Sequence, residues 1–402
     1  MLIVKKFGGS SVADKEKIMN VARRCIEDYE KGNDVVIVLS AMGKTTDGLL
    51  SKAYDINYNP PKRELDMLLV TGEQVSVALM AMAMHALGAP AISLNAAQVG
   101  MYTTSAYTKA KLKKIDTNRI RHELDARKIV IVTGFQGINR YDDMTTLGRG
   151  GSDTTAVAIA AALRADRCEI YTDVEGVYTA DPRIVPNARK LAEVSYDEML
   201  EFASLGAKVL HNRSVEMAKK YGVELVVLSS LTRAEGTIVK EETKVERMLV
   251  SGVAVDKNTA RISVIGVKNE PGIAFRIFNM LAKNQINVDI IIQSVGREDT
   301  KDISFTVART DLAETLDILN ENKEGFTASE ITCDETVAKV SIIGAGMVSN
   351  PGVAAKMFEA LANGGVNIKM IATSEIRITV LIDEQDANRA MRLVHDAFDL
   401  AD

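Results

Sequence analysis

Short aliphatic runs alternate with amphipathic stretches along the first 240 residues of the chain. Strands buried on both faces are predicted for five of these runs: LIVKKF, DVVIVLS, KIVIVTGF, CEIYTD and ELVVLSS. Between them, helical periodicity is found in segments such as KEKIMNVARRCIEDYEKG and TTAVAIAAALRA. Repeated alternation of strands and helices predicts an α/β fold with a mostly parallel sheet between layers of helices.

The pattern changes near residue 237, where the charged segment EGTIVKEETKVERM predicts a connection between domains. Beyond it the chain contains a repeat, because 24-residue segments beginning at Pro271 and Pro351 are identical at nine positions. Each copy follows a strand, opens a helix after Pro-Gly and continues into two strands and a second helix. The repeat therefore predicts two ferredoxin-like βαββαβ units.

The length of 402 residues suggests two or three domains, and we expect them at 1–240 and 241–402. Apolar residues make up 47% of the chain and charged residues 26%, as in soluble globular proteins. The net charge is −5, and the chain contains neither a basic run nor an interleaved aromatic stripe. Both observations argue against a nucleic-acid-binding protein.

The three cysteines, Cys25, Cys168 and Cys333, lie far apart in the sequence. An odd and widely spaced set excludes a disulfide framework, and no two of the three have metal-ligand spacing. We expect three reduced, buried thiols.

One long apolar segment, Val75–Leu94, needs to be distinguished from a membrane span. Its high alanine content, Gly88 and Pro90 predict a buried helix that ends near Gly88 instead. The chain begins MLIVKKF, and four apolar residues before two lysines are too few for the core of a signal peptide. We therefore expect a cytoplasmic protein with no membrane association.

The segment KKFGGSS, residues 5–11, is the first candidate for chemistry. A strand that runs into two glycines and two serines exposes backbone N–H groups that can bind phosphate oxygens, and Lys6 lies at the strand end. The segment is neither a G-x-G-x-x-G motif nor a Walker loop. A tight turn beside an exposed lysine is the alternative interpretation.

The segment TTLGRGGSDTT, beginning at Thr145, is the second candidate. Ser152 or Asp153 is predicted to cap the following helix, which is also the plainest role for either residue. A cap does not need Gly-Arg-Gly-Gly before it, and that loop can bring backbone groups and the Arg149 guanidinium close to an anion. We therefore favour a binding site here.

Three smaller groups of polar residues also lie at strand ends or helix starts. Asp173 follows the strand CEIYT, and the polar turn Asp181–Arg183 comes shortly after it. Ser40 and Thr46 follow the strand DVVIVL. Glu73 precedes a long apolar helix, where the helix dipole alone also favours an acidic residue.

The four histidines are scattered, and none has the order or spacing of a catalytic triad or a protein-only metal site. His211 is predicted to lie on a helix face. We expect no resident metal, so that any metal ion arrives with a nucleotide.

The chain resembles the aspartokinases, members of the amino acid kinase superfamily, in six features taken together: KKFGGSS, SAMGKTTD, TGE, TTLGRGGSDTT, YTDVEGVYTADPR and the duplicated tail, which is similar to tandem ACT domains. The resemblance covers essentially the whole chain. It implies ATP-dependent phosphorylation of the side-chain carboxylate of L-aspartate to 4-phospho-L-aspartate, with Mg²⁺ accompanying ATP and no tightly bound cofactor. It also implies a monofunctional enzyme at the first step of lysine, threonine, methionine and diaminopimelate biosynthesis, with feedback inhibition.

The resemblance further implies roles for individual residues. Lys6 would neutralise the transferring phosphoryl group, Asp153 would orient Lys6, the substrate ammonium or the metal-bound nucleotide, and Arg149 would bind a substrate carboxylate. The implied substrate side comprises Ser40, Thr46, Glu73, Arg149, Gly150, Gly151 and Ser152. The implied nucleotide side comprises Lys6, Gly8, Gly9, Ser10, Thr172, Asp173, Tyr178, Asp181, Pro182, Arg183 and Lys208.

In this family ACT modules pair between subunits and bind lysine, sometimes with threonine, and one copy is inserted in the other. The resemblance thus implies a first copy at about 262–335, a second at about 248–261 plus 336–402, and a homodimer or larger oligomer. The implied effector contacts are Asn287, Val288, Asp289 and Gln293 in the first copy, and Val353, Ala354, Asn367, Ile368, Ser374 and Glu375 in the second.

Two other functions are weighed against a kinase. A catalytically silent amino-acid sensor would use only the tail, but it would not need Lys6, Arg149 and Asp153, which are all present. A nicotinamide-dependent enzyme would need a G-x-G-x-x-G motif followed by an acidic residue, and the first turn lacks both.

Overall fold

The computed structural model describes residues 1–206, 209–241, 249–294 and 300–401. The chain forms two compact units. The first comprises Met1–Tyr178, Lys190–Ser204 and Lys208–Val245, and the second comprises Thr179–Arg189, Leu205–Ala207 and Glu246–Asp402. Residues 242–248 of the predicted connection lie outside the described residues.

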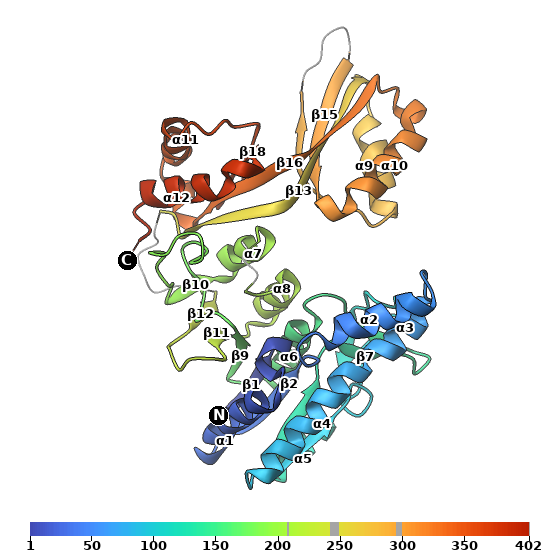
Figure 1. Ribbon diagram of the computed structural model, residues 1–402, viewed down its shortest axis with the longest axis vertical. Coiled ribbons are helices and arrows are strands. Elements are labelled where there is room, and N and C mark those ends of the chain that lie inside the picture. Colours follow the sequence, from blue (N-terminus) through green and yellow to red (C-terminus); the bar gives the residue numbers. More distant parts are fainter. Residues whose placement is uncertain (207–208, 242–248, 295–299, 402) are drawn as a thin grey trace. The chain divides into compact units, whose positions relative to one another are not determined.

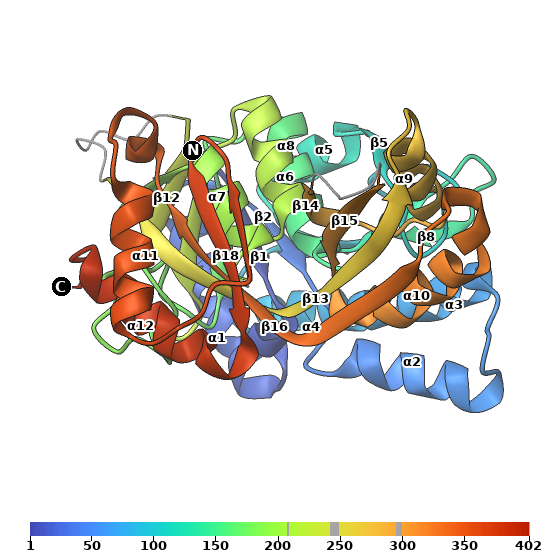
Figure 2. The same ribbon diagram turned by 90° about the horizontal axis from the view of Figure 1, so that it is seen from above.

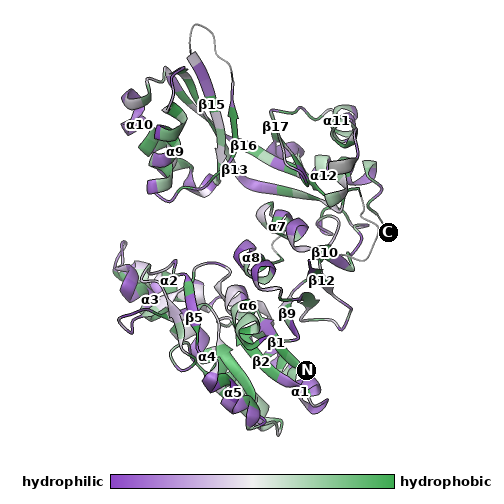
Figure 3. Ribbon diagram, turned by 180° about the vertical axis from the view of Figure 1, so that it is seen from behind, coloured by the Kyte–Doolittle hydropathy of each residue, from purple (hydrophilic) through white to green (hydrophobic). Residues whose placement is uncertain are grey.

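The first unit is built on an eight-stranded sheet with the order β10-β12-β11-β9-β1-β2-β6-β3. Its pairs are parallel except for the antiparallel pair β11 and β12, which confirms the predicted mostly parallel sheet. The strands are β1 (Leu2–Phe7), β2 (Asp34–Leu39), β3 (Ala91–Leu94), β6 (Ile129–Thr133), β9 (Arg167–Thr172), β10 (Glu193–Ser195), β11 (Leu225–Ser229) and β12 (Thr237–Lys240). Figure 3 shows the hydrophobic colouring along β1 and β2, in contrast to the largely polar helix α5.

Helices cover both faces of this sheet, because its central strands are buried on both sides. Helices α1 and α4 pack together on one face, and α6 and α8 pack together on the other, where α6 contacts β1, β2 and β9. The helices are α1 (Lys15–Glu30), α2 (Thr45–Ile56), α3 (Lys62–Leu69), α4 (Thr71–Ala86), α5 (Asn118–Asp125), α6 (Gly151–Leu163), α7 (Tyr196–Ser204) and α8 (Asn212–Tyr221). A small second sheet joins β5 (Leu112–Ile115), β4 (Met101–Thr103), β7 (Gln136–Ile138) and β8 (Met144–Thr146).

Helices α3 and α4, Lys62–Ala86, are the one stretch of the described chain that is long and apolar enough to cross a membrane. The most apolar part of this stretch is 56% buried inside the protein. Met80 and Met84 of α4 are fully buried in the core between α1, α4 and the sheet. The prediction of a buried helix is confirmed, and it ends just before Gly88, which adopts a φ of +82°.

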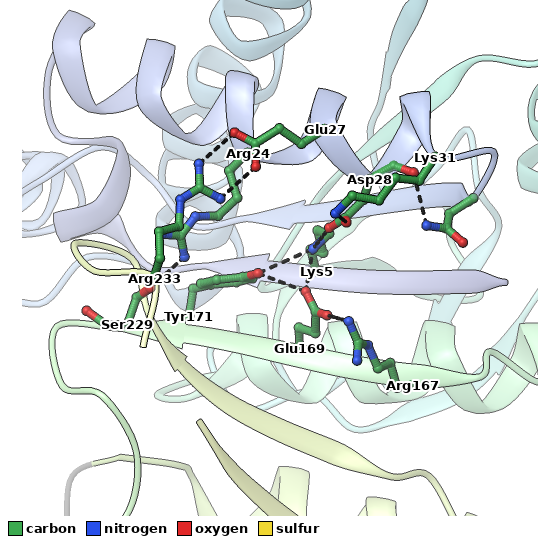
Figure 4. A network of polar contacts seen from close by, with 11 residues as sticks. Lys5, Arg24, Glu27, Asp28, Lys31, Arg167, Glu169, Tyr171, Ser229 and Arg233 are labelled. Carbon is green, nitrogen blue, oxygen red and sulfur yellow. Dashed lines mark hydrogen bonds and ion pairs between the residues drawn. The ribbon is translucent and has the colours of Figure 1, made fainter. Parts of the chain in front are cut away.

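The strand β1 places its two lysines on opposite faces of the sheet, because successive side chains of a strand alternate. Lys5 is fully buried on the face that packs against α1, within the polar network of Figure 4. Its Nζ lies 2.7 Å from Asp28 Oδ2 and also contacts the Glu169 carboxylate and the Tyr171 hydroxyl. Burial by itself would lower the pKa of Lys5, but the surrounding groups, chiefly the charge of Glu169, together outweigh it and raise the pKa. The network therefore ties β1 to α1 and β9 through a protonated lysine.

The second unit contains one six-stranded sheet with the order β14-β15-β13-β16-β18-β17. Two long strands, β13 (Gly252–Lys268) and β16 (Glu330–Ile343), pair antiparallel at its centre. The others are β14 (Val288–Gln293), β15 (Thr300–Val307), β17 (Met370–Thr373) and β18 (Arg377–Asp383). Helices α9 (Ile273–Lys283) and α10 (Leu312–Glu321) lie at one end of the long strands, and α11 (Val353–Asn363) and α12 (Ala387–Ala397) lie at the other (Figures 1 and 2).

Each long strand serves both copies of the repeat. The later half of β13 pairs with β15, and the later half of β16 pairs with β18. The first half of β13, from Gly252 to Asp256, pairs with the later half of β16. The predicted pair of βαββαβ units is therefore confirmed as two units that share one continuous sheet.

One expectation about the cysteines is wrong. Cys25 and Cys168 are buried as expected, and burial raises the pKa of the Cys25 thiol to about 12. Cys333 is exposed, because the first seven residues of β16, Glu330–Thr336, are all at least partly accessible to solvent.

Candidate active site

The carboxyl ends of three neighbouring parallel strands meet at one edge of the first sheet. Phe7 at the end of β1 is in register with Leu39 of β2 and with Tyr171 of β9. The residues that follow these strands, Gly8, Ser40 and Asp173, are thereby brought to the same edge. Open α/β sheets bind their ligands at this edge.

Lys6 and Asp153 form an ion pair at this edge. The side chain of Lys6 points to the face of β1 that packs against α6, opposite to that of Lys5. Its Nζ lies 2.6 Å from Asp153 Oδ1 in the first turn of α6. The two side chains are only 13% and 12% exposed. Partial burial strengthens the electrostatic interaction of this pair with any charged group that enters the site.

The Gly8–Ser11 turn packs closely against the loop that follows β2. Gly43 N donates to Gly9 O at 2.9 Å, and a Cβ on Gly9 would lie 2.6 Å from the carbonyl oxygen of Ala41. No side chain fits at Gly9. A Cβ on Gly8 would lie 3.5 Å from Lys6 Nζ, an ordinary contact distance, which places the Gly8 backbone directly beside the lysine.

The predicted cap of α6 is wrong. The N-cap is Gly150 with a φ of +67°, and no side chain caps the helix. Ser152 and Asp153 lie inside the first turn, because the left-handed glycine starts the helix before them. Their side chains make contacts across the site instead, since Ser40 Oγ donates to Ser152 Oγ at 2.9 Å and Asp153 pairs with Lys6.

His211 is not on a helix face as predicted, because it is the N-cap of α8 and its Nδ1 accepts from Arg213 N at 3.4 Å. The ring packs against Gly150, where a Cβ would lie 2.2 Å from the ring. Arg213 donates to the carbonyl oxygens of Leu147 and Ala110 at 3.0 and 3.1 Å. The start of α8 therefore holds the glycine-rich loop in place. Histidine is not among the residues that usually mark a helix N-cap, so the sequence carried no signal for this role.

Arg149 lies in that loop and is exposed. None of the residues that the structure describes forms a hydrogen bond or ion pair with its guanidinium. The loop is thus fixed by α8 while the arginine side chain stays available to an anionic ligand.

Glu73, in the first turn of α4, is 3% exposed and is the most perturbed carboxyl group of the site. Its Oε1 accepts from Ala41 N at 3.2 Å, and within the described residues its buried Oε2 has no hydrogen-bond partner. Burial raises the pKa of Glu73 to about 7. A buried carboxylate oxygen without a partner fits a ligand that brings a positive charge.

Two residues beside Glu73 belong to the site although the sequence did not predict them. Ser76 Oγ donates to the carbonyl oxygen of Ser40 at 2.9 Å, and Gln136 Nε2 donates to that of Val70 at 2.5 Å. Both side chains are buried. They fix the backbone around Ser40 and at the start of α4, and no motif in the sequence marks them.

The remaining candidates are distributed as follows. Thr46 is half-buried at the start of α2. Thr172 Oγ1 donates to the exposed Asp173 at 3.1 Å, and Tyr178 forms an isolated bridge with Lys190. Asp181, Pro182 and Arg183 belong to the second unit, and Lys208 lies outside the described residues. The described residues include no group of three or more His, Cys, Asp or Glu side chains that could hold a metal ion.

Comparison with known families matches the chain to two family models. The model of the amino acid kinase family matches residues 1–229, and that of the ACT domain matches residues 262–322 and 340–398.

Several curated relatives match over the full length of the chain, including two from Bacillus. The aspartokinase of Bacillus sp. (strain MGA3) is 52% identical over 401 residues, which is 100% of this chain and 98% of that protein. Aspartokinase 2 of Bacillus subtilis (strain 168) is 50% identical over 401 residues, with the same shares covered.

Solved structures of aspartokinases also match nearly the whole chain. The chain is 26% identical to E. coli aspartokinase III in complex with aspartate and ADP in the R state, with a TM-score of 0.85 and 99% of each chain covered. It is 27% identical to the same enzyme in complex with lysine and aspartate in the T state, with a TM-score of 0.78 and 99% of each chain covered.

Proposed function

This chain belongs to the aspartokinases of the amino acid kinase family, and on that premise we propose how its residues transfer a phosphoryl group. The enzyme phosphorylates the side-chain carboxylate of L-aspartate with ATP and carries ACT domains for allosteric regulation. The observation that carries the proposed residue roles is the shielded Lys6–Asp153 pair, 2.6 Å apart, beside the glycine turn after β1.

The chemistry needs cations more than it needs a base. The acceptor carboxylate is already ionised at pH 7, so no proton has to be removed before it attacks. The difficulty is the repulsion between this carboxylate and the phosphates. We assign Lys6 to neutralise the charge that develops on the transferring phosphoryl group, and Asp153 to hold the Lys6 ammonium in position.

The nucleotide side is proposed to be built around the glycine turn. The N–H groups of Gly8, Gly9 and Ser10 bind phosphate oxygens. The other residues assigned to this side are Thr172, Asp173, Tyr178, Asp181, Pro182, Arg183 and Lys208. Mg²⁺ binds through phosphates and one or two carboxylates, and the exposed Asp173 at the end of β9 fits that requirement. Bound there, Mg²⁺ supplies charge neutralisation to the phosphates.

The substrate side is proposed to recognise both ends of aspartate. Glu73 binds the ammonium group, which its unpartnered buried Oε2 supports. Arg149 binds the α-carboxylate with its forked guanidinium. Ser40, Thr46, Gly150, Gly151 and Ser152 complete the site.

The proposed reaction is tested by trapping its product. Hydroxylamine converts an acyl phosphate into a hydroxamate, so the enzyme is expected to form hydroxamate from L-aspartate only when ATP is present. Loss of hydroxamate on omitting either substrate is the control. ATP consumption without hydroxamate would mean that the acceptor is not a carboxylate.

The raised pKa of Glu73 predicts that aspartate binding weakens in mild acid. Only the ionised carboxylate attracts the ammonium, so with a pKa of about 7 the KM for aspartate should rise about tenfold from pH 8 to pH 6. Glu73→Gln should show a high KM that no longer varies with pH. The KM for ATP is the internal control, and a pH-independent KM for aspartate in the wild type would contradict the role of Glu73.

The same substitution should increase stability at high pH. The folded state binds the Glu73 proton more tightly than the unfolded state, so the ionised group destabilises the fold above pH 7 and not below about pH 4.5. Glu73→Gln should therefore exceed the wild type by on the order of 3 kcal/mol at pH 8 and by nothing near pH 4. Chemical denaturation at both pH values measures this difference.

Regulation is proposed to act through the ACT copies. Gly272 and Gly352 cap α9 and α11 with φ of +96° and +94°, which leaves the first N–H groups of both helices open to the carboxylate of an amino acid. We propose lysine, threonine or both as effectors, at Asn287, Val288, Asp289, Gln293, Val353, Ala354, Asn367, Ile368, Ser374 and Glu375. In this structure Asp289 is already paired with Lys339. Calorimetric titration that detects neither amino acid would contradict the proposal.

The outer strands of the second sheet support oligomerisation through the ACT domains. Ile291 of β14 and Ile371 of β17 occupy equivalent positions of the repeat and are 51% and 44% exposed. Exposed apolar residues on unpaired edge strands favour pairing with another chain. We propose a homodimer or larger oligomer, and a mass of one chain in light scattering would contradict it.

Three further proposals concern the domains and the setting of the enzyme. We assign residues 1–240 to the catalytic domain and 241–402 to the regulatory domain. Within the latter, 248–261 go with 336–402 as the second ACT copy, which the pairing of Gly252–Asp256 with β16 supports. We also propose a cytoplasmic enzyme at the first step of lysine, threonine and methionine biosynthesis. Separate expression of 1–240 and measurement of its cooperative unfolding tests the boundary.

A further inference from the structure

The segment Thr179–Arg189 belongs to the second unit, although the residues on both sides of it belong to the first. Its two ends are joined to each other, because Thr179 N donates to Arg189 O at 2.9 Å and Arg189 N donates to Thr179 Oγ1 at 3.0 Å. Between them, the Arg183 guanidinium binds the Asp181 carboxylate through three contacts of 2.9, 3.2 and 2.7 Å. The segment is therefore a closed loop that carries the turn assigned to the nucleotide.

Three backbone groups of this loop are bound by the second ACT copy and the end of the chain. Val253 N of β13 donates to Thr179 O at 2.7 Å, and Arg392 Nε of α12 donates to Ile184 O at 2.9 Å. Ala188 forms an antiparallel bridge with Ala401. Residues of the regulatory repeat thus hold the loop at its start, middle and end.

The most specific of these contacts involves His395 of α12, which is fully buried. Its Nε2 lies 3.0 Å from Thr179 Oγ1. The Thr179 hydroxyl donates its single proton to Leu400 O at 3.0 Å and accepts from Arg189 N. The contact with His395 is then a donation from Nε2–H, which assigns the tautomer of the ring from its hydrogen bonds. All three bonding positions of the hydroxyl are used.

We propose that α12, through His395 and Arg392, positions the Asp181–Arg183 turn for nucleotide binding. The inference rests on the proposed nucleotide-side role of that turn. The Arg183 side chain is 85% exposed and is bound to Asp181 of the same turn, so the backbone of the loop carries both charged groups. If the loop is not held, ordering it on binding costs conformational entropy, which weakens nucleotide affinity and leaves the chemical step unchanged. The second ACT copy thereby contributes positioning residues to the kinase reaction.

The test uses the full-length enzyme and ADP as the probe. His395→Ala should weaken ADP binding and raise the KM for ATP about tenfold, while kcat at saturating ATP and the KM for aspartate stay within about twofold. His395→Gln should restore much of the affinity, because its amide nitrogen can replace Nε2–H as the donor to Thr179. His395→Asn is too short to do so and should behave like His395→Ala.

Two arginines of α12 provide a test variant and its matched control. Arg392→Ala removes the bond to Ile184 O and should raise the KM for ATP about threefold. Arg389, on the same helix, pairs with Asp386 and makes no contact with the loop within the described residues. Arg389→Ala should leave the KM for ATP unchanged.

Arg183→Ala separates the two ways in which the proposal can fail. If Arg183→Ala weakens ADP binding and His395→Ala does not, the positioning role is overturned and the nucleotide-side assignment stands. If Arg183→Ala leaves ADP binding unchanged, the assignment fails, and the inference fails with it. A His395→Ala variant in which kcat and thermal stability fall while both KM values rise, without rescue by glutamine, would also overturn the proposal.

Discussion

Replacement of Lys6 by alanine is expected to lower kcat by about 10³-fold, with the KM for aspartate changed only a few-fold. The reason is that the Lys6 ammonium is most useful when charge develops on the phosphoryl group in flight, and much less useful when the substrates are merely bound. The partly buried position of the Lys6–Asp153 pair makes this loss larger than that of a surface cation. ATP-dependent hydroxamate formation from aspartate measures the effect.

The control for this substitution is a second lysine–aspartate pair of the same length. Lys219 Nζ lies 2.6 Å from Asp197 Oδ1, and both side chains are largely exposed, at 37% and 56%. Lys219→Ala should leave kcat within about twofold of the wild type, because exposed pairs contribute little. Thermal unfolding of Lys6→Ala shows whether the fold is intact. A folded Lys6→Ala enzyme with near-normal kcat would remove Lys6 from the mechanism.

Replacement of Lys5, the residue before Lys6, should lower the stability of the fold and not the rate of the chemical step. Its ammonium is held by Asp28 and Glu169 on the α1 face of the sheet, away from the site (Figure 4). Its removal leaves two carboxylates without their shared cation, which costs stability. Lys5 and Lys6 are the same residue type and differ in the face of the sheet to which their side chains point. The alternation of side chains along β1 therefore decides which of the two lysines reaches the site.

Features that depend on local sequence could be predicted. Buried strands, the glycine turn after β1 and the duplicated βαββαβ pattern each follow from residues that are close together in the chain. The edge of the sheet where the candidate residues meet follows from the parallel topology, since it needs only the strand ends.

Features that depend on distant contacts could not be predicted in this way. Asp153 looks like a helix cap, and it lies inside the helix because Gly150 begins the helix earlier and Lys6 pairs with the carboxylate. His211 became part of the site because its ring meets Gly150, 61 residues earlier in the chain. The placement of Thr179 in the second unit depends on His395, 216 residues away. None of these contacts leaves a periodic or spaced pattern in the sequence.

The second large effect is expected for Arg149, a cation of the candidate site whose guanidinium has no hydrogen-bond or ion-pair partner among the described residues. Arg149→Ala should lower kcat/KM for aspartate by about 10²- to 10³-fold, mainly through KM, because a charged pair to the α-carboxylate is lost from ground state and transition state alike. The affinity for ADP should not change. Arg149→Lys should recover little of the activity, since a single ammonium cannot reproduce the two parallel hydrogen bonds of a guanidinium.

The structure of the loop allows the effect of Arg149 on binding to be separated from an effect on stability. Arg149 makes no contact that holds the loop within the described residues, whereas Arg213 binds the carbonyl oxygens of Leu147 and Ala110. Arg149→Ala should therefore leave the unfolding temperature unchanged, and Arg213→Ala should lower both stability and activity. The exposed Arg140, which contacts only its neighbour Tyr141 in the described residues, is the matched surface control and should have no effect. If Arg149→Ala changes kcat and leaves the KM for aspartate intact, then Arg149 acts on the phosphoryl group and another residue must bind the α-carboxylate.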